Sequence, residues 1–140
     1  MHPAAVQLTR DVYEQYLKHK GYELVGETLR YPFSGGRVIS YLRGCNSHNR
    51  DNAPYWSFQV DTRILFDGLD YDPETWPVTW MFGDGPDGSY SGGLYGIEDQ
   101  DPMTARKIAD DILGLTDRLL EERDATRVAF EWRLKQSGRK

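Results

Sequence analysis

The residues from Tyr55 to Phe66 alternate between apolar and polar side chains, and this alternation constrains the fold more than any other feature. Successive side chains of a β-strand point to opposite faces, so the pattern predicts a strand with one face in the core. The other face then meets water or a partner, as in an antiparallel sheet. We weigh two interpretations of it equally, a recognition platform and a solvated surface. The core face carries Trp56, Phe58, Val60, Ile64 and Phe66, and the other face carries Tyr55, Ser57, Gln59, Asp61 and Arg63.

Shorter runs with the same two-residue period lie on both sides of this strand. Turn residues bound each run, including Gly26 and the Ser-Gly-Gly sequence at 34–36. We expect strands at Tyr22–Val25, Thr28–Phe33, Arg37–Arg43 and Val78–Phe82, and either a short glycine-interrupted strand or a loop at Tyr90–Ile97.

Helical spacing of apolar residues appears only near the two ends of the chain. The first segment, Pro3 to Lys20, has a broad apolar face and is followed by Gly21, a typical stop residue. Asp101 and Pro102 are typical of a helix start, as N-cap and first helical residue. Asp124 either caps a second helix or lies within a continuous one. The apolar stripe that follows Pro102 consists of Ala105, Ile108, Ile112, Leu115 and Leu119.

That C-terminal stripe predicts burial in the core, with a homodimer seam as the alternative interpretation. We therefore predict one α+β domain over residues 1–140. It has an N-terminal helix, an antiparallel sheet of about four to six strands, and a long C-terminal helix, or two helices, packed on one face of the sheet.

The charge distribution is uneven. The chain of 140 residues has a net charge of −5, yet the stretch from Ile64 to Ala105 holds nine acidic residues and no Lys or Arg. A basic stripe is absent, so direct nucleic-acid binding is not expected. We predict a cytoplasmic protein without a membrane span, because neither a signal peptide nor a long apolar stretch is present. The single cysteine excludes an intramolecular disulfide.

Two motifs resemble ligand-binding loops by their letters alone. The sequence from Gly83 to Gly88 matches G-x-G-x-x-G, but Pro86 lacks an N–H and the two aspartates would repel phosphate. A calcium loop starting at Asp70 would have Thr75 where the turn needs Gly and Met81 where it needs Glu. We therefore expect turns in both places and no cofactor, and an irregular divalent-cation site is the remaining alternative.

Cys45 and His48 lie three residues apart in a polar loop, with Asp51 nearby. Two ligands do not make a zinc site, and a catalytic cysteine also needs an orienting group and an oxyanion hole. Carboxylate pairs for glycoside hydrolysis depend on a three-dimensional separation that the sequence leaves open. We assign no catalytic or metal-binding residue, and our interpretation leans away from an enzyme.

The acidic stretch is interleaved with aromatic residues, which is typical of a surface that binds a basic protein. A solubilising acidic face is the alternative interpretation of the same stretch. We predict a non-enzymatic binding module that docks a basic partner. In size and charge alone it resembles inhibitors of nucleic-acid-processing enzymes, such as bacterial immunity proteins and phage-encoded antagonists. The predicted partner-binding residues are Asp67, Asp70, Asp72, Glu74, Trp76, Asp84, Asp87, Tyr90, Tyr95, Glu98 and Asp99.

Two alternatives remain open. One is a small-molecule pocket or minor enzyme where the sheet meets the Gly-rich segment Gly83–Gly96, lined by Trp76, Tyr90 and Tyr95. The other is a dimeric structural subunit, associated through the C-terminal helix.

Overall fold

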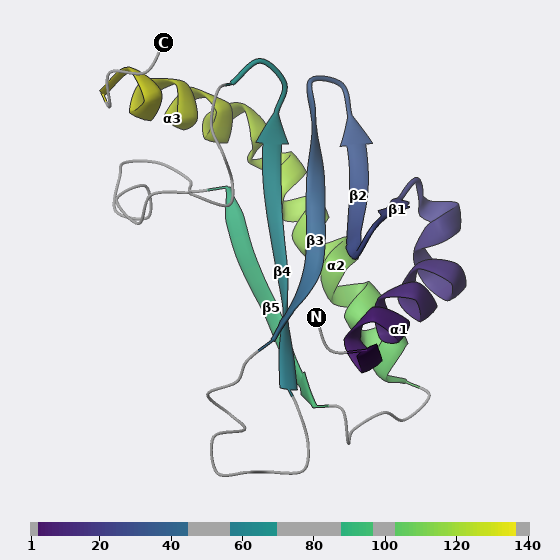
Figure 1. Cartoon of the computed structure of the whole chain (residues 1–140). Coiled ribbons are helices and arrows are strands. Elements are labelled where there is room, and N and C mark those ends of the chain that lie inside the picture. The colour runs from purple at the N-terminus through teal and green to yellow at the C-terminus, as the bar shows by residue number, and fades with distance from the viewer. Residues whose placement is uncertain (1–2, 45–56, 70–87, 97–102, 137–140) are drawn as a thin grey trace.

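The computed structural model describes residues 3–44, 57–69, 88–96 and 103–136. Its strands form one antiparallel sheet in which each strand pairs with the next along the chain, in the order β1-β2-β3-β4-β5 (Figure 1). This confirms the predicted α+β fold, with an N-terminal helix and two C-terminal helices. The elements are α1 (Pro3–Val12), η1 (Tyr13–Leu17), η2 (Lys18–Lys20), β1 (Glu23–Val25), β2 (Thr28–Phe33), β3 (Gly36–Gly44), β4 (Ser57–Phe66), β5 (Ser89–Gly96), α2 (Thr104–Glu121) and α3 (Arg123–Gln136).

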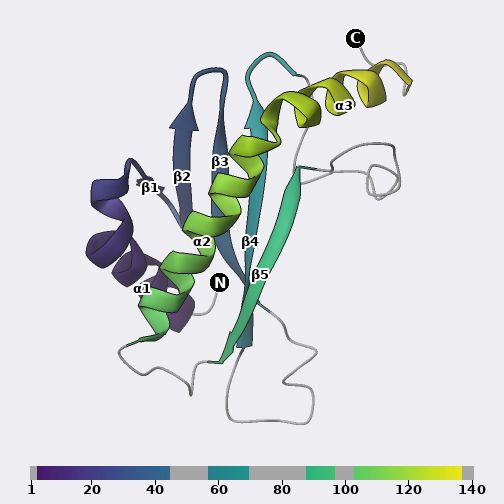
Figure 2. The same cartoon turned by 180° about the vertical axis from the view of Figure 1, so that it is seen from behind.

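The helices cover one face of this sheet. Figure 2 shows α2 crossing the sheet diagonally, with α1 beside it at the β1 side. One core cluster joins α1 and α2 to the strands through residues such as Leu17, Phe58 and Ile112. A second cluster joins the end of α2 and α3 to the strands through Leu119, Phe130 and Ile64. Each fully buried side chain of this kind contributes about 1.5–3 kcal/mol, so the two clusters hold helices and sheet together.

The N-terminal helix covers the predicted range but changes its winding. Val12 and Leu17 are both fully buried although they lie five residues apart, a spacing that a regular α-helix would place on different faces. The segment Tyr13–Leu17 is a π-helix, in which Lys18 N–H donates to the Tyr13 carbonyl. This wider turn returns Leu17 to the core. Gly21 ends the helix with φ +87°, which confirms the predicted stop.

The C-terminal stripe lies in the core, as predicted, except that Leu115 is only partly buried. Thr116 takes the buried position instead, where its hydroxyl accepts a hydrogen bond from the Tyr22 hydroxyl at 2.8 Å. The helical region divides near Glu122, which confirms a second helix, but Asp124 lies in the first turn of α3 and does not precede it as the predicted cap. The described part of α2 begins at Thr104, and the predicted start at Asp101 and Pro102 lies outside the described residues.

The strands agree closely with the predicted ranges. The segment Tyr90–Ile97, predicted as either a strand or a loop, corresponds to the strand β5. β5 pairs with β4, and the register of this pairing shifts between Gln59 and Asp61. The strand predicted at Val78–Phe82 lies outside the described residues, as does the start of the strand predicted from Tyr55. No helix among the described residues is long and apolar enough to cross a membrane.

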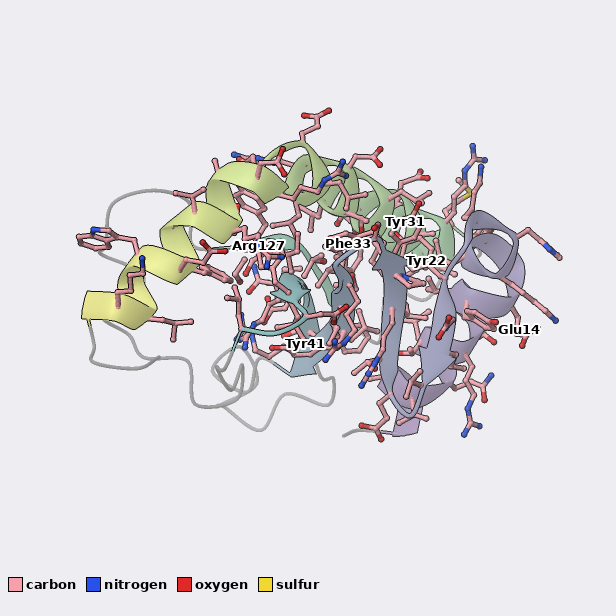
Figure 3. All side chains as sticks on the ribbon, turned by 90° about the horizontal axis from the view of Figure 1, so that it is seen from above. Glu14, Tyr22, Tyr31, Phe33, Tyr41 and Arg127 are labelled. Carbon is pink, nitrogen blue, oxygen red and sulfur yellow. The ribbon has the colours of Figure 1, made fainter. Side chains whose placement is uncertain are left out.

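The face of the sheet that points away from α2, here called the outer face, is less exposed than the alternation predicts. Asp61 is only 6% exposed, and Ser57 and Leu65 on the same face are also buried. Neighbouring strands supply the cover: the Asp61 carboxylate accepts hydrogen bonds from Arg43 Nε at 2.7 Å and Ser91 Oγ at 2.9 Å. In Figure 3, Tyr41 lies on this outer side, whereas Tyr22 and Tyr31 lie on the helix side. The polar residues of β4 are therefore built into a cross-strand network and do not form a simply solvated face.

Candidate functional site

Three of the eleven predicted partner-binding residues lie in the described part of the chain: Asp67, Tyr90 and Tyr95. Asp67 follows β4, and its exposed carboxylate lies 3.7 Å from Arg37 Nη1. The two tyrosines lie on β5 and are partly buried. The structure brings the tyrosines, but not Asp67, together with acidic groups of α2 and its end. The other eight residues lie outside the described ranges: Asp70, Asp72, Glu74, Trp76, Asp84, Asp87, Glu98 and Asp99.

Tyr95 connects β5 to the middle of α2. Tyr95 pairs with Phe58 of β4, so its side chain lies on the helix side of the sheet as the Phe58 side chain does. Its hydroxyl donates to Asp111 Oδ2 at 2.6 Å. The backbone N–H of Gly93 donates to the same oxygen at 2.9 Å. Burial raises the pKa of Tyr95, and the adjacent Asp111 carboxylate raises it further. Tyr95 therefore stays protonated and acts as a hydrogen-bond donor that fixes the Asp111 carboxylate.

Tyr90 makes a similar connection at the other end of β5. Its hydroxyl donates to both carboxylate oxygens of Glu122, with Oε2 at 2.7 Å. The guanidinium carbon of Arg118 lies 4.0 Å from the centre of the Tyr90 ring, a distance at which a cation–π interaction is favourable. We call Tyr90, Tyr95, Asp111 and Glu122 the tyrosine–acid seam. Each tyrosine of the seam holds one carboxylate in a defined orientation.

Further acidic residues line the exposed side of α2 beside this seam. From Asp110 to Glu122 the chain has five acidic residues and one basic residue, Arg118. Asp110, Asp117 and Glu121 are exposed, and we call them the α2 ridge. Their separations of seven and four residues place them on one side of a helix. These residues escaped prediction because residues 106–140 as a whole carry nine basic and seven acidic residues, so the region does not stand out as acidic. Their helical spacing was the signal that would have revealed them.

The contact between β5 and α2 is tightly packed where the alternative hypothesis places a pocket. A Cβ atom added to Gly92 would lie 3.2 Å from both Asp111 Oδ2 and Leu115 Cδ1. At Gly93 it would lie 2.9 Å from both Asp111 Oδ2 and the Tyr95 hydroxyl. The two glycines let the strand approach the helix closely. The side chains therefore fill this part of the interface between β5 and α2.

The net negative charge of the chain lies entirely outside the described residues. The described residues include 14 Lys and Arg and 13 Asp and Glu, so their charges nearly balance. The α2 ridge and the seam are therefore a local concentration of negative charge and do not belong to a generally acidic described surface.

The other candidate groups give no site among the described residues. Cys45, His48 and Asp51 lie outside the described ranges, and so do Asp70 to Glu74 and most of the Gly83–Gly88 motif. Gly88 itself is described and has φ +73°, as in a turn. Within the described ranges, no three His, Cys, Asp or Glu side chains are grouped so that they could hold a metal ion. Comparisons with protein families, curated proteins and solved structures give no match for this chain.

Proposed function

We propose that this protein is a non-enzymatic binding module that docks a basic protein on the tyrosine–acid seam and the α2 ridge. One observation carries the proposal: Tyr90 and Tyr95 hold the Glu122 and Asp111 carboxylates beside three exposed acidic residues. The partner's positive charge follows from the five carboxylates of the seam and the α2 ridge, because they outnumber Arg118, the one basic residue between Asp110 and Glu122. An inhibitor or antagonist role remains the expectation from size and charge.

The arrangement suits recognition of basic side chains for two physical reasons. Exposed charges of one sign speed the encounter with an oppositely charged partner, and fixed carboxylates lose little freedom when they bind it. The seam already binds a guanidinium group within the chain, since Arg118 stacks on Tyr90. An arginine of the partner would instead meet the exposed carboxylates of the α2 ridge, to which a guanidinium group can donate two parallel hydrogen bonds.

A small-molecule pocket at the same place remains the second candidate, because Tyr90 and Tyr95 were predicted to line it. The close approach of Gly92 and Gly93 to α2 argues against this pocket in the described residues. A ligand screen by thermal shift tests it, since a bound small molecule raises the melting temperature. Stabilisation by a small molecule but by no basic protein would favour the pocket.

The docking proposal is tested by reversing the charge of the ridge. The double variant Asp110→Lys/Asp117→Lys changes two exposed residues, and neither accepts a hydrogen bond within the seam. The matched control is Glu14→Lys/Glu27→Lys, which changes the net charge equally at exposed positions far along the chain from β5 and α2. Each purified protein is immobilised and exposed to extract of its native host at low salt, and the retained proteins are quantified by mass spectrometry.

We expect the wild type and the control to retain the same basic protein, and the ridge variant to retain at least about tenfold less. Added salt should release the partner, because screening weakens attraction between exposed charges. Equal retention by the ridge variant and the wild type would contradict the proposal. So would a wild type that retains no basic protein above the level of an uncoated support.

A further inference from the structure

α3 presents large apolar side chains on the face opposite its core contacts. Phe130 and Leu134 are buried, whereas Val128 is 66% exposed and Trp132 is 49% exposed. The pair Val128 and Trp132 lies one helical turn apart, so the two side chains are neighbours on the helix surface. Figures 1 and 2 show α3 running past the β5 edge of the sheet. An exposed tryptophan beside an exposed valine is typical of a protein interface.

These two residues belong to a longer exposed stripe with a regular spacing. Its members are separated by four, three, four and three residues, the spacing of one side of a helix that packs along another helix. Backbone hydrogen bonds from Glu122 N–H to the Arg118 carbonyl and from Thr126 N–H to the Glu122 carbonyl continue the helical pattern from α2 into α3. We call this set the α3 stripe: Glu121, the last residue of α2, followed across the turn at Glu122 by Ala125, Val128, Trp132 and Lys135 of α3, all of them exposed.

We propose that the α3 stripe is the interface of a homodimer in which two copies of α3 pack antiparallel about a two-fold axis at Val128. In a two-fold interface the same surface patch serves both copies, so the stripe must be complementary to its own reversed order. The α3 stripe meets this condition in both charge and size. It begins with an acidic residue and ends with a basic one, each seven residues from Val128.

An antiparallel pair therefore places Glu121 of each copy opposite Lys135 of the other copy, which gives two ion pairs. Trp132 of each copy lies over Ala125 of the other, so the largest side chain faces the smallest. The two Val128 side chains meet at the axis. A parallel pair would instead set Glu121 against Glu121 and Lys135 against Lys135, and like charges repel. A basic partner protein explains the stripe less well than a second copy does. Lys135 at one end of the stripe would repel a basic partner, whereas a second copy supplies Glu121 to pair with it.

The interface is small. One pair of helices in contact over about four turns buries less than the ~1,200–2,000 Å² of a standard stable interface. We therefore expect an equilibrium between monomer and dimer at protein concentrations on the order of 10–100 µM. The dimer shares Glu121 with the α2 ridge, but the two proposals are tested separately: the dimer test uses the purified chain alone, and the docking test changes Asp110 and Asp117, which lie outside the stripe.

The test is sedimentation velocity of the full chain over a series of concentrations, with circular dichroism as the check that each variant is folded. The variants are Glu121→Lys, Lys135→Glu and the double swap Glu121→Lys/Lys135→Glu, all at exposed positions. Each single change sets like charges against each other in the antiparallel pair, so the dissociation constant should rise at least about tenfold. The double swap recreates two opposite-charge pairs and should restore dimerisation to within about threefold of the wild type.

The variant Trp132→Ala tests the apolar centre of the stripe and should also abolish the dimer at these concentrations. Three results would overturn the proposal: a wild type that remains monomeric up to about 1 mM, single variants that dimerise like the wild type, or a double swap that does not recover. If the chain is monomeric and Trp132→Ala loses a captured partner, the stripe serves that partner and not a second copy.

Discussion

Replacing Gly88 with alanine tests how α3 is held against the sheet. Gly88 has φ +73°, and an added Cβ would lie 2.6 Å from Phe130 Cζ and 3.1 Å from Ile64 Cγ2. Phe130 is fully buried, so its ring cannot move aside without disturbing the second core cluster. The left-handed backbone costs about 1–2 kcal/mol for a residue with a Cβ. Overpacking a filled core adds about 1–3 kcal/mol. We therefore expect Gly88→Ala to lower the free energy of unfolding by about 2–5 kcal/mol.

Gly68→Ala is the matched control. Gly68 also has a positive φ, +81°, but nothing lies within 4 Å of an added Cβ. It should cost only the backbone term of about 1–2 kcal/mol. Urea unfolding followed by far-ultraviolet circular dichroism measures both variants, with the slope against denaturant expected to stay the same. Equal destabilisation of the two variants would refute the packing of Phe130 over Gly88.

Two further predictions concern buried polar groups, Tyr22 on the helix side of the sheet and Asp61 on its outer face. Burial raises the pKa of Tyr22 to about 12, so its hydroxyl stays neutral in the folded protein at pH values where it ionises in the unfolded chain. The contribution of the neutral Tyr22 hydroxyl to the free energy of unfolding is complete below pH 10. It is lost as the pH rises from about 10 to about 12, a change of about 3 kcal/mol. Tyr22→Phe should reduce this loss in unfolding measurements at high pH, and an unchanged pH dependence would contradict the burial of Tyr22. Asp61→Ala should lower the free energy of unfolding by about 2–3 kcal/mol, because Arg43 and Ser91 lose their shared acceptor. Asp67→Ala removes only an exposed ion pair and should change the free energy of unfolding by less than about 0.5 kcal/mol. Similar losses in Asp61→Ala and Asp67→Ala would contradict the structural role of Asp61.

The sequence predicted the order and type of the described elements because local periodicity specifies them. The alternation in β4 and the stripe from Ala105 to Leu119 each arise from one segment whose apolar residues face one core. The π-turn escaped prediction, although the five-residue step from Val12 to Leu17 records it. Regular helical spacing places Tyr16, four residues after Val12, on the core face, and only the packing against α2 decides between Tyr16 and Leu17.

The features that escaped prediction depend on contacts between distant segments. Asp61 was expected to face water or a partner because its own strand shows only an alternating pattern. Its burial results from Arg43 and Ser91, which neighbouring strands bring to it. The seam escaped in the same way, since Tyr95 was assigned to an acidic loop surface while its actual acidic partner, Asp111, lies on α2. A one-dimensional pattern identifies which residues share a face, but not which residues of another element meet them there.

The central claim is that negative charge on α2 beside Tyr90 and Tyr95 recruits a basic protein. Its most direct test is the association rate of the captured partner, measured by stopped-flow fluorescence at 50 mM and 500 mM salt. For the wild type we expect the rate to fall at least about tenfold as the salt rises, because exposed charges are screened. Asp110→Lys/Asp117→Lys should associate slowly at both salt concentrations. A wild-type rate that is independent of salt and unchanged by this charge reversal would contradict the claim.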